Sequence, residues 1–306
     1  MVLTAIGLML QQHYLERRSY TTISGRGLRA ETIRLGNWKR IVFAFCAVSL
    51  FLSAIAPIAV LVIAAFTKNW VEGLVPANLT LANFGDALLH NQVAVRGIFN
   101  NFQLAAGAAL CAGVIGAAVA YLDLRTRVVG RRLLDYLAIL PLGLPGTVMA
   151  VSVMLAFIRP PFATYGTIWI LLVAYIARFV PLATRSANAT LRQIDPSLEE
   201  AARIAGARRM GALRRILLPL SRPGLAVAFL LVFIPALSEL SATILLYTGG
   251  TETISIAIFR LNDLGQLEVV SALSVFTIAI TLLVSVPLNL LSNRSRITPS
   301  AGGPAI

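Results

Sequence analysis

The sequence predicts an all-α membrane protein with six transmembrane helices, cytoplasmic N- and C-termini, and a cytoplasmic helical hairpin. Three observations carry this prediction. Of the 306 residues, 58% are hydrophobic and only 13% are charged, which is more apolar surface than a soluble domain can bury. Apolar stretches of membrane-spanning length recur along the chain. The basic residues between them are divided unevenly between the two sides.

Six apolar stretches reach the length of about 20 helical residues that a bilayer requires. They are Ile41–Phe66, Phe102–Leu122, Leu137–Ile158, Thr164–Leu182, Gly224–Tyr247 and Val269–Leu291. A transmembrane domain is therefore expected over residues 41–292. Residues 1–40 are expected to form an N-terminal stub with a basic cytoplasmic linker, and residues 293–306 a cytoplasmic tail.

The positions of the basic residues predict the orientation. Of the 26 Lys and Arg residues, 21 fall on the side that holds both termini, four fall on the other side, and Arg178 lies within a span. Positive charge accumulates in cytoplasmic loops, so this division places both termini in the cytoplasm. The formal net charge of +13 is then explained by membrane-flanking arginines, and nucleic acid is not an expected partner.

Small residues in the second span predict a packing face. Ala105, Ala109, Gly113 and Ala117 recur every four residues, a spacing that lets two membrane helices approach closely. The alternative is that Ala and Gly are simply common in membrane helices.

The third span contains a sequence that an ideal helix cannot accommodate. In the run from Pro141 to Gly146, Pro141 and Pro145 remove backbone donors and two glycines add conformational freedom. Irregular backbone at membrane depth must be buried in protein or line a wet cavity. We therefore expect Pro145 and Gly146 to lie near a translocation path inside the bundle.

The loop between the fourth and fifth spans, about residues 186–222, is polar and rich in arginine. The dipeptide Asp195-Pro196 is typical of a helix start. The segment Ser197–Ala205 that follows is rich in helix formers, and Glu199 and Glu200 lie near the positive end of the helix dipole. The sequence therefore predicts a short helix at the start of this loop.

A second helix is expected to complete a hairpin. Gly206 is placed to end the first helix in a left-handed turn. A second short helix over Arg208–Leu217 is expected to stop at Pro219. Ala201 and Ala202 would give the hairpin a slim surface that fits a groove. The alternative is an amphipathic loop lying on lipid headgroups.

The spacing in this loop resembles a known motif. Glu200-Ala201-Ala202 is followed after three residues by Gly206 and after nine more by Ile216-Leu217-Leu218-Pro219. This pattern resembles the EAA motif of ABC-importer permease subunits. The resemblance implies that the hairpin docks on an ATP-binding subunit and transmits its closure to the membrane by alternating access. The expected docking residues are Glu199, Glu200, Ala201, Ala202, Gly206, Ile216 and Pro219.

The same resemblance implies where ATP is bound. The chain contains no G-x-x-x-x-G-K-[ST] phosphate loop, so ATP and Mg are expected in the partner ATPase and no cofactor is expected in this chain. A transport subunit, not an enzyme, is therefore expected, in the bacterial inner membrane with its surrounding lipid.

Three further segments resemble the branch of this family that includes ferric-iron permeases: NLTLANF at 78–84, LPLGLPG at 140–146 and ELSATIL at 239–245. The resemblance implies a periplasmic solute-binding protein that delivers substrate, with ferric iron as the first expectation. Related branches move polyamines, thiamine, phosphonates or sulfate. Residues 10–27 resemble the junction of a fused two-half permease, so the chain would pair with a separate first half or with itself, or be an inactive half-permease fragment.

Glu239 is an ionisable residue that lies fifteen residues after Gly224, the start of the predicted fifth span. A carboxylate there costs about 2.5 to 3.5 kcal/mol, so it should face the bundle interior, be paired or be protonated. With Ser238 and Ser241 it could line the path; the alternative is a helix-packing carboxylate. Counting from the predicted span ends puts Arg178 about 10 Å away in depth, a poor partner. Glu239→Gln is expected to impair uptake without abolishing assembly.

A rival function is a secondary transporter driven by an ion gradient. Six spans and Glu239 would suit it, but it leaves the cytoplasmic hairpin unexplained. The two histidines, His13 and His90, stand alone in the sequence, so no metal site is expected.

Overall fold

The computed structural model describes residue 36 and residues 38–294, with side chains to residue 286. Within this part of the chain the regular structure is helical, apart from one isolated bridge between Thr67 and Leu79. Five of the described helices are long and apolar enough to cross a membrane, and a bent pair could provide a sixth span. The predicted all-α membrane class is therefore confirmed. The predicted stub over residues 1–35 and the tail from residue 295 lie outside the described residues, and the orientation of the termini stays a prediction.

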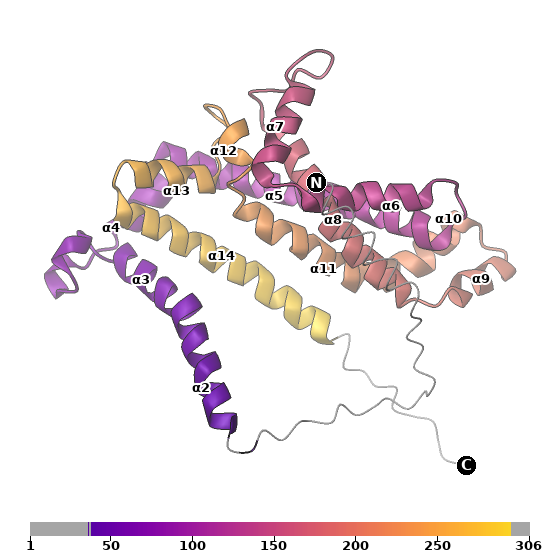
Figure 1. Cartoon of the computed structure of the whole chain (residues 1–306), viewed down its shortest axis with the longest axis horizontal. Coiled ribbons are helices and arrows are strands. Elements are labelled where there is room, and N and C mark those ends of the chain that lie inside the picture. Colours follow the sequence, from indigo (N-terminus) through magenta and orange to yellow (C-terminus); the bar gives the residue numbers. More distant parts are fainter. Residues whose placement is uncertain (1–35, 37, 295–306) are drawn as a thin grey trace.

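Figure 1 shows how the α-helices are arranged; short 3-10 and π turns lie between some of them, and loops join the others. In chain order they are α2 (Trp38–Leu50), η1 (Phe51–Ile55), α3 (Ala56–Ala65), η2 (Trp70–Glu72), η3 (Pro76–Asn78), α4 (Ala82–Gly85), η4 (Asp86–His90), α5 (Gln92–Arg125), α6 (Arg131–Ile139), η5 (Leu140–Gly143), α7 (Gly146–Phe157), α8 (Ile168–Arg192), α9 (Ser197–Ile204), α10 (Arg209–Ala212), η6 (Leu213–Leu217), α11 (Leu218–Leu237), α12 (Thr243–Leu246), α13 (Ile254–Asp263) and α14 (Leu267–Arg294).

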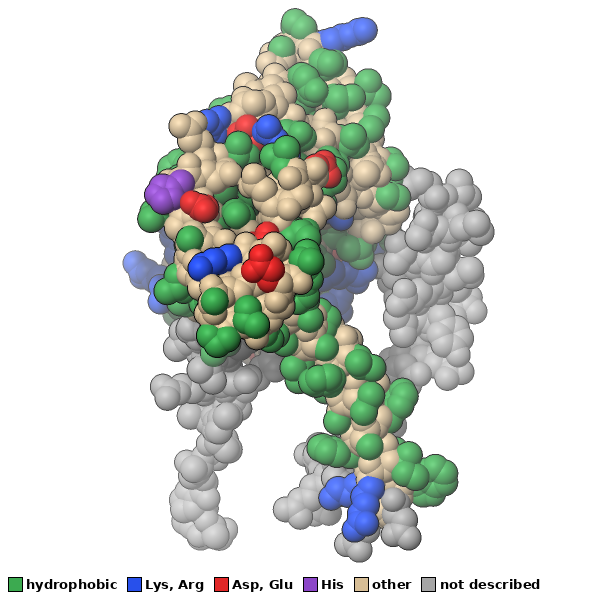
Figure 2. All heavy atoms as spheres, turned by 90° about the vertical axis from the view of Figure 1, so that its left-hand side faces the viewer, with side chains coloured by type: hydrophobic (Ala, Val, Ile, Leu, Met, Phe, Trp, Pro, Cys, Tyr) green, Lys and Arg blue, Asp and Glu red, His purple; other side chains and the backbone are tan. Residues whose placement is uncertain are grey.

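The first predicted span is one helix of 28 residues, made by α2, η1 and α3. It leans away from the other helices in Figure 1, and α2 buries none of its side chains. Figure 2 shows hydrophobic side chains along this protruding helix, with Lys and Arg at its end. An apolar segment such as α2, which buries none of its side chains, is typical of contact with lipid or with another membrane helix.

Three helices form the centre of the bundle. The long helix α5 packs along α8, and α11 packs against both of them. Their shared core contains Leu104 of α5, Tyr175 of α8 and Phe233 of α11. Outside this core, α14 packs against α3 and α11. The helix α8 continues to Arg192, ten residues beyond the predicted end of the fourth span.

The small-residue face of α5 differs from the predicted one. Ala105 and Ala109 are buried as expected, but Gly113 has open space beside it and Ala117 is only half-buried. The close approach to α8 is made instead by Gly116. A spacing of four residues rotates by about 40° per step around a helix with 3.6 residues per turn, so the predicted stripe leaves the interface after two steps.

The third and fifth predicted spans are broken, not continuous. The third bends by 117° between Gly143 and Gly146, and α7 then projects sideways from the bundle (Figure 1). The predicted break at the Pro-Gly run within Leu137–Ile158 is therefore confirmed. In the fifth span, α11 ends at Leu237 and the backbone leaves helical geometry around Glu239 before α12 begins.

The segment between α12 and α14 contains a helix, α13, that was not predicted. It has ten residues, too few to cross a membrane, and it includes Arg260. The loop before it lies against α5, where the Asn100 amide donates to the carbonyl oxygens of Gly250 and Glu252, at 3.0 and 2.9 Å. A Cβ on Gly97 would lie 2.9 Å from the Thr253 carbonyl oxygen, so this contact requires glycine.

Candidate functional site

The predicted hairpin is present, and its first helix is capped as expected. At the start of α9, Oδ1 of Asp195 accepts the Ser197 N–H at 2.8 Å. This hydrogen bond favours the charged carboxylate and holds the pKa of Asp195 below its ordinary value. At the other end, Gly206 has a φ of +89°, and its N–H bonds to the Arg203 carbonyl oxygen at 3.0 Å. The predicted left-handed turn at Gly206 is confirmed.

The second arm of the hairpin does not stop at Pro219. From Arg209 the chain runs as one helix of 29 residues through α10, η6 and α11, to Leu237. The prediction of a stop was wrong because this helix continues through Pro219, which follows a π turn that changes the backbone hydrogen-bond pattern. Just before it, the π turn η6 lets the Leu218 N–H bond back to Leu213. The hairpin is therefore continuous with the fifth span.

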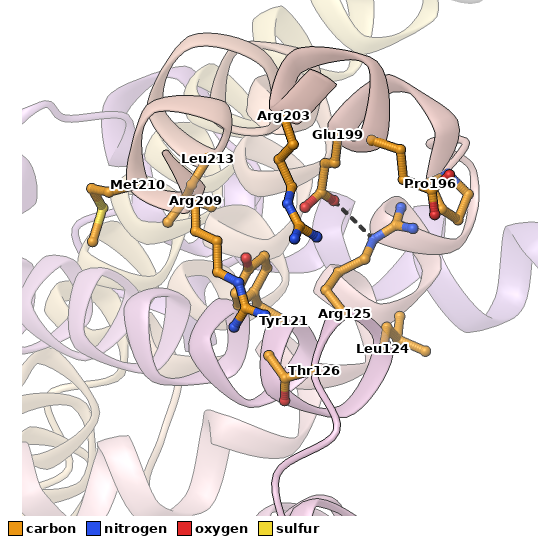
Figure 3. A pocket seen from close by; sticks show the side chains of 11 residues that line it. Tyr121, Leu124, Arg125, Thr126, Pro196, Glu199, Arg203, Arg209, Met210 and Leu213 are labelled. Carbon is orange, nitrogen blue, oxygen red and sulfur yellow. Dashed lines mark ion pairs between the residues drawn. The ribbon is translucent and has the colours of Figure 1, made fainter. Parts of the chain in front are cut away.

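An ion pair that the sequence did not predict fixes the hairpin to the bundle. Nε of Arg125, at the end of α5, lies 3.2 Å from Oε1 of Glu199 on α9, although the two atoms are not aligned as a hydrogen bond (Figure 3). Both side chains are shielded, with 8% and 17% exposed. Arg125 also donates to the carbonyl oxygens of Leu191, in the last turn of α8, and of Ile194, in the connection to α9. Glu199, an expected docking residue, thus faces the permease core in this structure.

The other expected docking residues divide between the exposed surface and the base of the hairpin. Glu200, Ala201 and Gly206 are exposed, whereas Ala202, Ile216 and Pro219 are half-buried. The sequence reading passed over Ile204, whose side chain is 89% exposed, and the exposed Met210. Exposed apolar side chains on a polar hairpin were the available signal for a protein contact.

A second site, within the transmembrane region, centres on Glu239. Nε of Arg178 lies 2.7 Å from Oε2 of Glu239, so the expectation that Arg178 is a poor partner was wrong. The depth count failed because α8 extends to Arg192 and places Arg178 near the helix middle. The other carboxylate oxygen, Oε1, accepts the Ala242 N–H at 2.9 Å, which ties the carboxylate to the break between α11 and α12.

Two of the expected path residues meet at this ion pair. A Cβ on Gly146 would lie 2.3 Å from a terminal guanidinium nitrogen of Arg178 and 2.7 Å from Cβ of Ser241. The breaks of the third and fifth spans therefore lie against the same arginine. Pro145, Ser238 and Ser241 are exposed, whereas Gly146 and Glu239 are buried.

Tyr175 of α8 forms further hydrogen bonds to the broken segment between α11 and α12. Its hydroxyl lies 2.7 Å from Oγ1 of Thr243 and donates to the Glu239 carbonyl oxygen at 3.3 Å. On the other side of the break, the Asn101 amide of α5 donates to the Leu237 carbonyl oxygen at 2.9 Å. Side chains from two neighbouring helices thus satisfy backbone groups that the broken helix leaves open.

Comparison with known proteins identifies the family. Residues 109–297, more than half of the chain, match the family described as the binding-protein-dependent transport system inner membrane component. The chain belongs to this family. In the terms of this family, the bundle is a multi-pass inner-membrane permease, a transport subunit and not an enzyme.

Two curated permeases illustrate the relationship. A 2-aminoethylphosphonate transport system permease protein of Salmonella paratyphi A is 28% identical over 78% of this chain and 89% of its own length. The ferric transport system permease protein of Actinobacillus pleuropneumoniae is 29% identical over 89% of this chain. The chain spans only 39% of that ferric permease.

Solved permease structures share the fold. A chain of a bacterial ABC transporter involved in alginate import superposes with a TM-score of 0.68 at 21% identity, covering 86% of this chain and 98% of that one. A chain of the MetNI methionine ABC transporter superposes with a TM-score of 0.54 at 17% identity, covering 65% of this chain and 94% of that one. At these identities the likeness concerns the fold alone.

Proposed function

We propose that this chain is the permease subunit of an ATP-driven importer and that the α9–α10 hairpin is its docking element. Separate ATP-binding subunits would carry ATP and Mg, a solute-binding protein would deliver substrate on the outer side, and a second permease half would complete the pathway. The observation that carries the proposal is the hairpin itself: a capped, glycine-turned helix with exposed apolar side chains, continuous with a membrane-spanning helix.

The geometry provides two mechanical connections from the hairpin into the membrane. One is covalent, because α10 continues through η6 into α11 and reaches the break at Glu239. The other is the ion pair between Arg125 and Glu199, which joins α9 to the end of α5. A movement of the hairpin would therefore be passed to both α5 and α11, two of the three central helices.

The docking role is tested with the double variant Gly206→Pro plus Glu200→Arg. Proline cannot adopt the positive φ of Gly206, so the turn must open, and the new arginine reverses an exposed charge. Co-purification with the ATP-binding subunit is expected to be lost. Glu72→Arg plus Gly73→Pro is a matched control, because Gly73 also has a positive φ, of +71°, in the loop after α3. Retained binding by the hairpin variant, or equal loss in the control, would remove the docking claim.

For the substrate we propose two candidates, ferric iron and a phosphonate. Ferric iron follows from the three segments that resemble ferric permeases and from the ferric relative. The phosphonate is favoured by the phosphonate relative, which this chain matches over nearly its whole length. It is also favoured by the ion pair, because Glu239 is 6% exposed and Arg178 is 26% exposed, so the guanidinium is the more accessible charge.

Uptake measurements discriminate between these candidates. Proteoliposomes carrying the assembled importer would be supplied with labelled ferric iron or labelled 2-aminoethylphosphonate, each presented with the binding protein. We expect uptake of one substrate, and we expect it to require ATP and the ATP-binding subunit. Uptake that follows an ion gradient without that subunit would instead support a secondary transporter, and no uptake of either substrate would remove both candidates.

A further inference from the structure

A charged pocket lies between the hairpin and the C-terminal end of α5. In the predicted orientation this end of α5 is on the cytoplasmic side. The pocket has a volume of about 350 Å³ and is formed by α5, α9, α10 and η6 (Figure 3). Its charged side chains are three arginines, Arg125, Arg203 and Arg209, and two carboxylates, Glu199 and Glu200. The pocket therefore carries an excess of one positive charge.

The charges in the pocket are not evenly compensated. Glu199 pairs with Arg125, which is held in place by the two carbonyl oxygens at the start of the hairpin. Among the described residues, neither Arg203 nor Arg209 has a carboxylate oxygen within 4.0 Å. Both side chains line the pocket together with Tyr121 of α5; in Figure 3 the guanidinium group of Arg203 lies toward Glu199 and that of Arg209 toward Tyr121. Two arginines that line one pocket repel each other, and an anion between them removes that cost.

A second, apolar cavity adjoins the charged pocket on the side toward the middle of α5. It has a volume of about 60 Å³, is formed by α5, α8, η6 and α11, and shares Tyr121 and Leu213 with the charged pocket. Its lining reaches Ala117, one helical turn deeper along α5 than Tyr121. A positively charged pocket with an apolar cavity next to it matches a ligand with an anionic head and a hydrocarbon part, provided that Tyr121 or Leu213 moves to connect the two spaces.

We propose that the two cavities together bind an anionic phospholipid of the cytoplasmic leaflet. Its phosphate group lies between Arg203 and Arg209, where guanidinium groups can donate paired hydrogen bonds to phosphate oxygens. The first carbons of an acyl chain fill the apolar cavity beside Ala117 and Leu213. Arginines at the cytoplasmic surface also meet the negative potential of anionic lipids, which adds to the attraction.

A lipid bound at this site would link the hairpin to the helix bundle. The lipid would contact α9 and α10 through the arginines, and α5 and α11 through the apolar cavity. It would therefore act beside the ion pair of Arg125 and Glu199 as a second tie between the hairpin and the bundle. The binding claim itself does not depend on which partner the hairpin docks with.

The test compares two double variants of the full-length chain, purified with the subunits that accompany it. Arg203→Gln/Arg209→Gln removes the pocket charges. Arg214→Gln/Arg215→Gln removes the same charge from η6; these two arginines are exposed, as Arg203 and Arg209 are, but they do not line the pocket. Each protein is placed in nanodiscs of phosphatidylcholine with increasing phosphatidylglycerol, and in detergent with inorganic phosphate. The thermal midpoint and the co-purified lipid, by mass spectrometry, are measured.

We expect phosphatidylglycerol to raise the thermal midpoint of the parent chain and of the η6 control, and to be retained by both. The pocket variant should retain roughly tenfold less, because two charge-assisted contacts are lost. Equal losses in both variants would show a general surface-charge effect and overturn the site. An equal response to inorganic phosphate alone would show that free phosphate, not a lipid, is the ligand, and would overturn the lipid assignment.

Discussion

Gly116→Ala is expected to destabilise the packing of α5 on α8 by about 2 to 3 kcal/mol, the cost of overpacking a close contact. A Cβ at this position would lie 2.6 Å from the backbone nitrogen of Thr184 and 2.7 Å from the carbonyl carbon of Ala183. Backbone atoms cannot rotate away as a side-chain tip can, so the two helices must separate. The measurement is the thermal midpoint of the purified protein in detergent, together with the yield of monodisperse protein.

Gly113→Ala is the matched control for Gly116→Ala. It makes the same substitution three residues earlier on the same helix, where a new Cβ meets nothing within 4 Å. It should leave the thermal midpoint unchanged or raise it slightly, because alanine is a better helix former than glycine. Similar behaviour of the two variants would contradict the assignment of Gly116, and not Gly113, to the helix contact.

Arg178→Gln is expected to be the most damaging single substitution at the membrane ion pair. It leaves the buried carboxylate of Glu239 without its partner, and removing one member of a buried pair costs about 3 to 5 kcal/mol. Glu239→Gln should be milder for assembly, because Arg178 is the more exposed of the two and can still be hydrated. The amide oxygen of Gln can also still accept the Ala242 N–H. Yield and thermal midpoint measure assembly.

The double variant Arg178→Gln/Glu239→Gln tests whether the two residues act as a pair. Its loss of stability should be smaller than the sum of the two single losses, because it leaves no unpaired charge. Additive losses would show that the ion pair does not operate in the folded protein. Uptake by Glu239→Gln is expected to fall although the subunit assembles; wild-type uptake at limiting substrate would remove Glu239 from the translocation path.

Local patterns in the sequence were sufficient to predict the first helix of the hairpin and the turn that ends it. Asp195, Pro196 and Gly206 act through hydrogen bonds and dihedral angles within a few residues, so their roles can be read without the rest of the fold. The proline–glycine run at 141–146 predicted a break for the same reason. Apolar length likewise indicated where the membrane segments lie, although the ends of α5 and α8 extend well past the apolar core.

Contacts between distant segments could not be predicted in this way. The pairing of Arg178 with Glu239 depends on how far α8 continues past its apolar part and on the angle at which α11 crosses it. The pairing of Arg125 with Glu199 joins residues that the apolar pattern assigns to two different loops. Gly113 and Gly116 are both glycines in the same apolar helix. Only the rotation of α5 relative to α8 makes Gly116, and not Gly113, face the neighbouring backbone.

The sequence by itself determined the membrane class, most of the spans and the turn-bounded hairpin, because apolar length, capping residues and glycine dihedrals act over short stretches of chain. The tertiary structure decided that the fifth span is broken as well, that both breaks meet at Arg178, and that Glu199 ties the hairpin to α5. It also decided that a charged pocket and an apolar cavity lie next to each other at the base of the hairpin, with Tyr121 and Leu213 lining both. These features depend on the rotation, depth and crossing of helices, which are set by side-chain packing across the whole bundle.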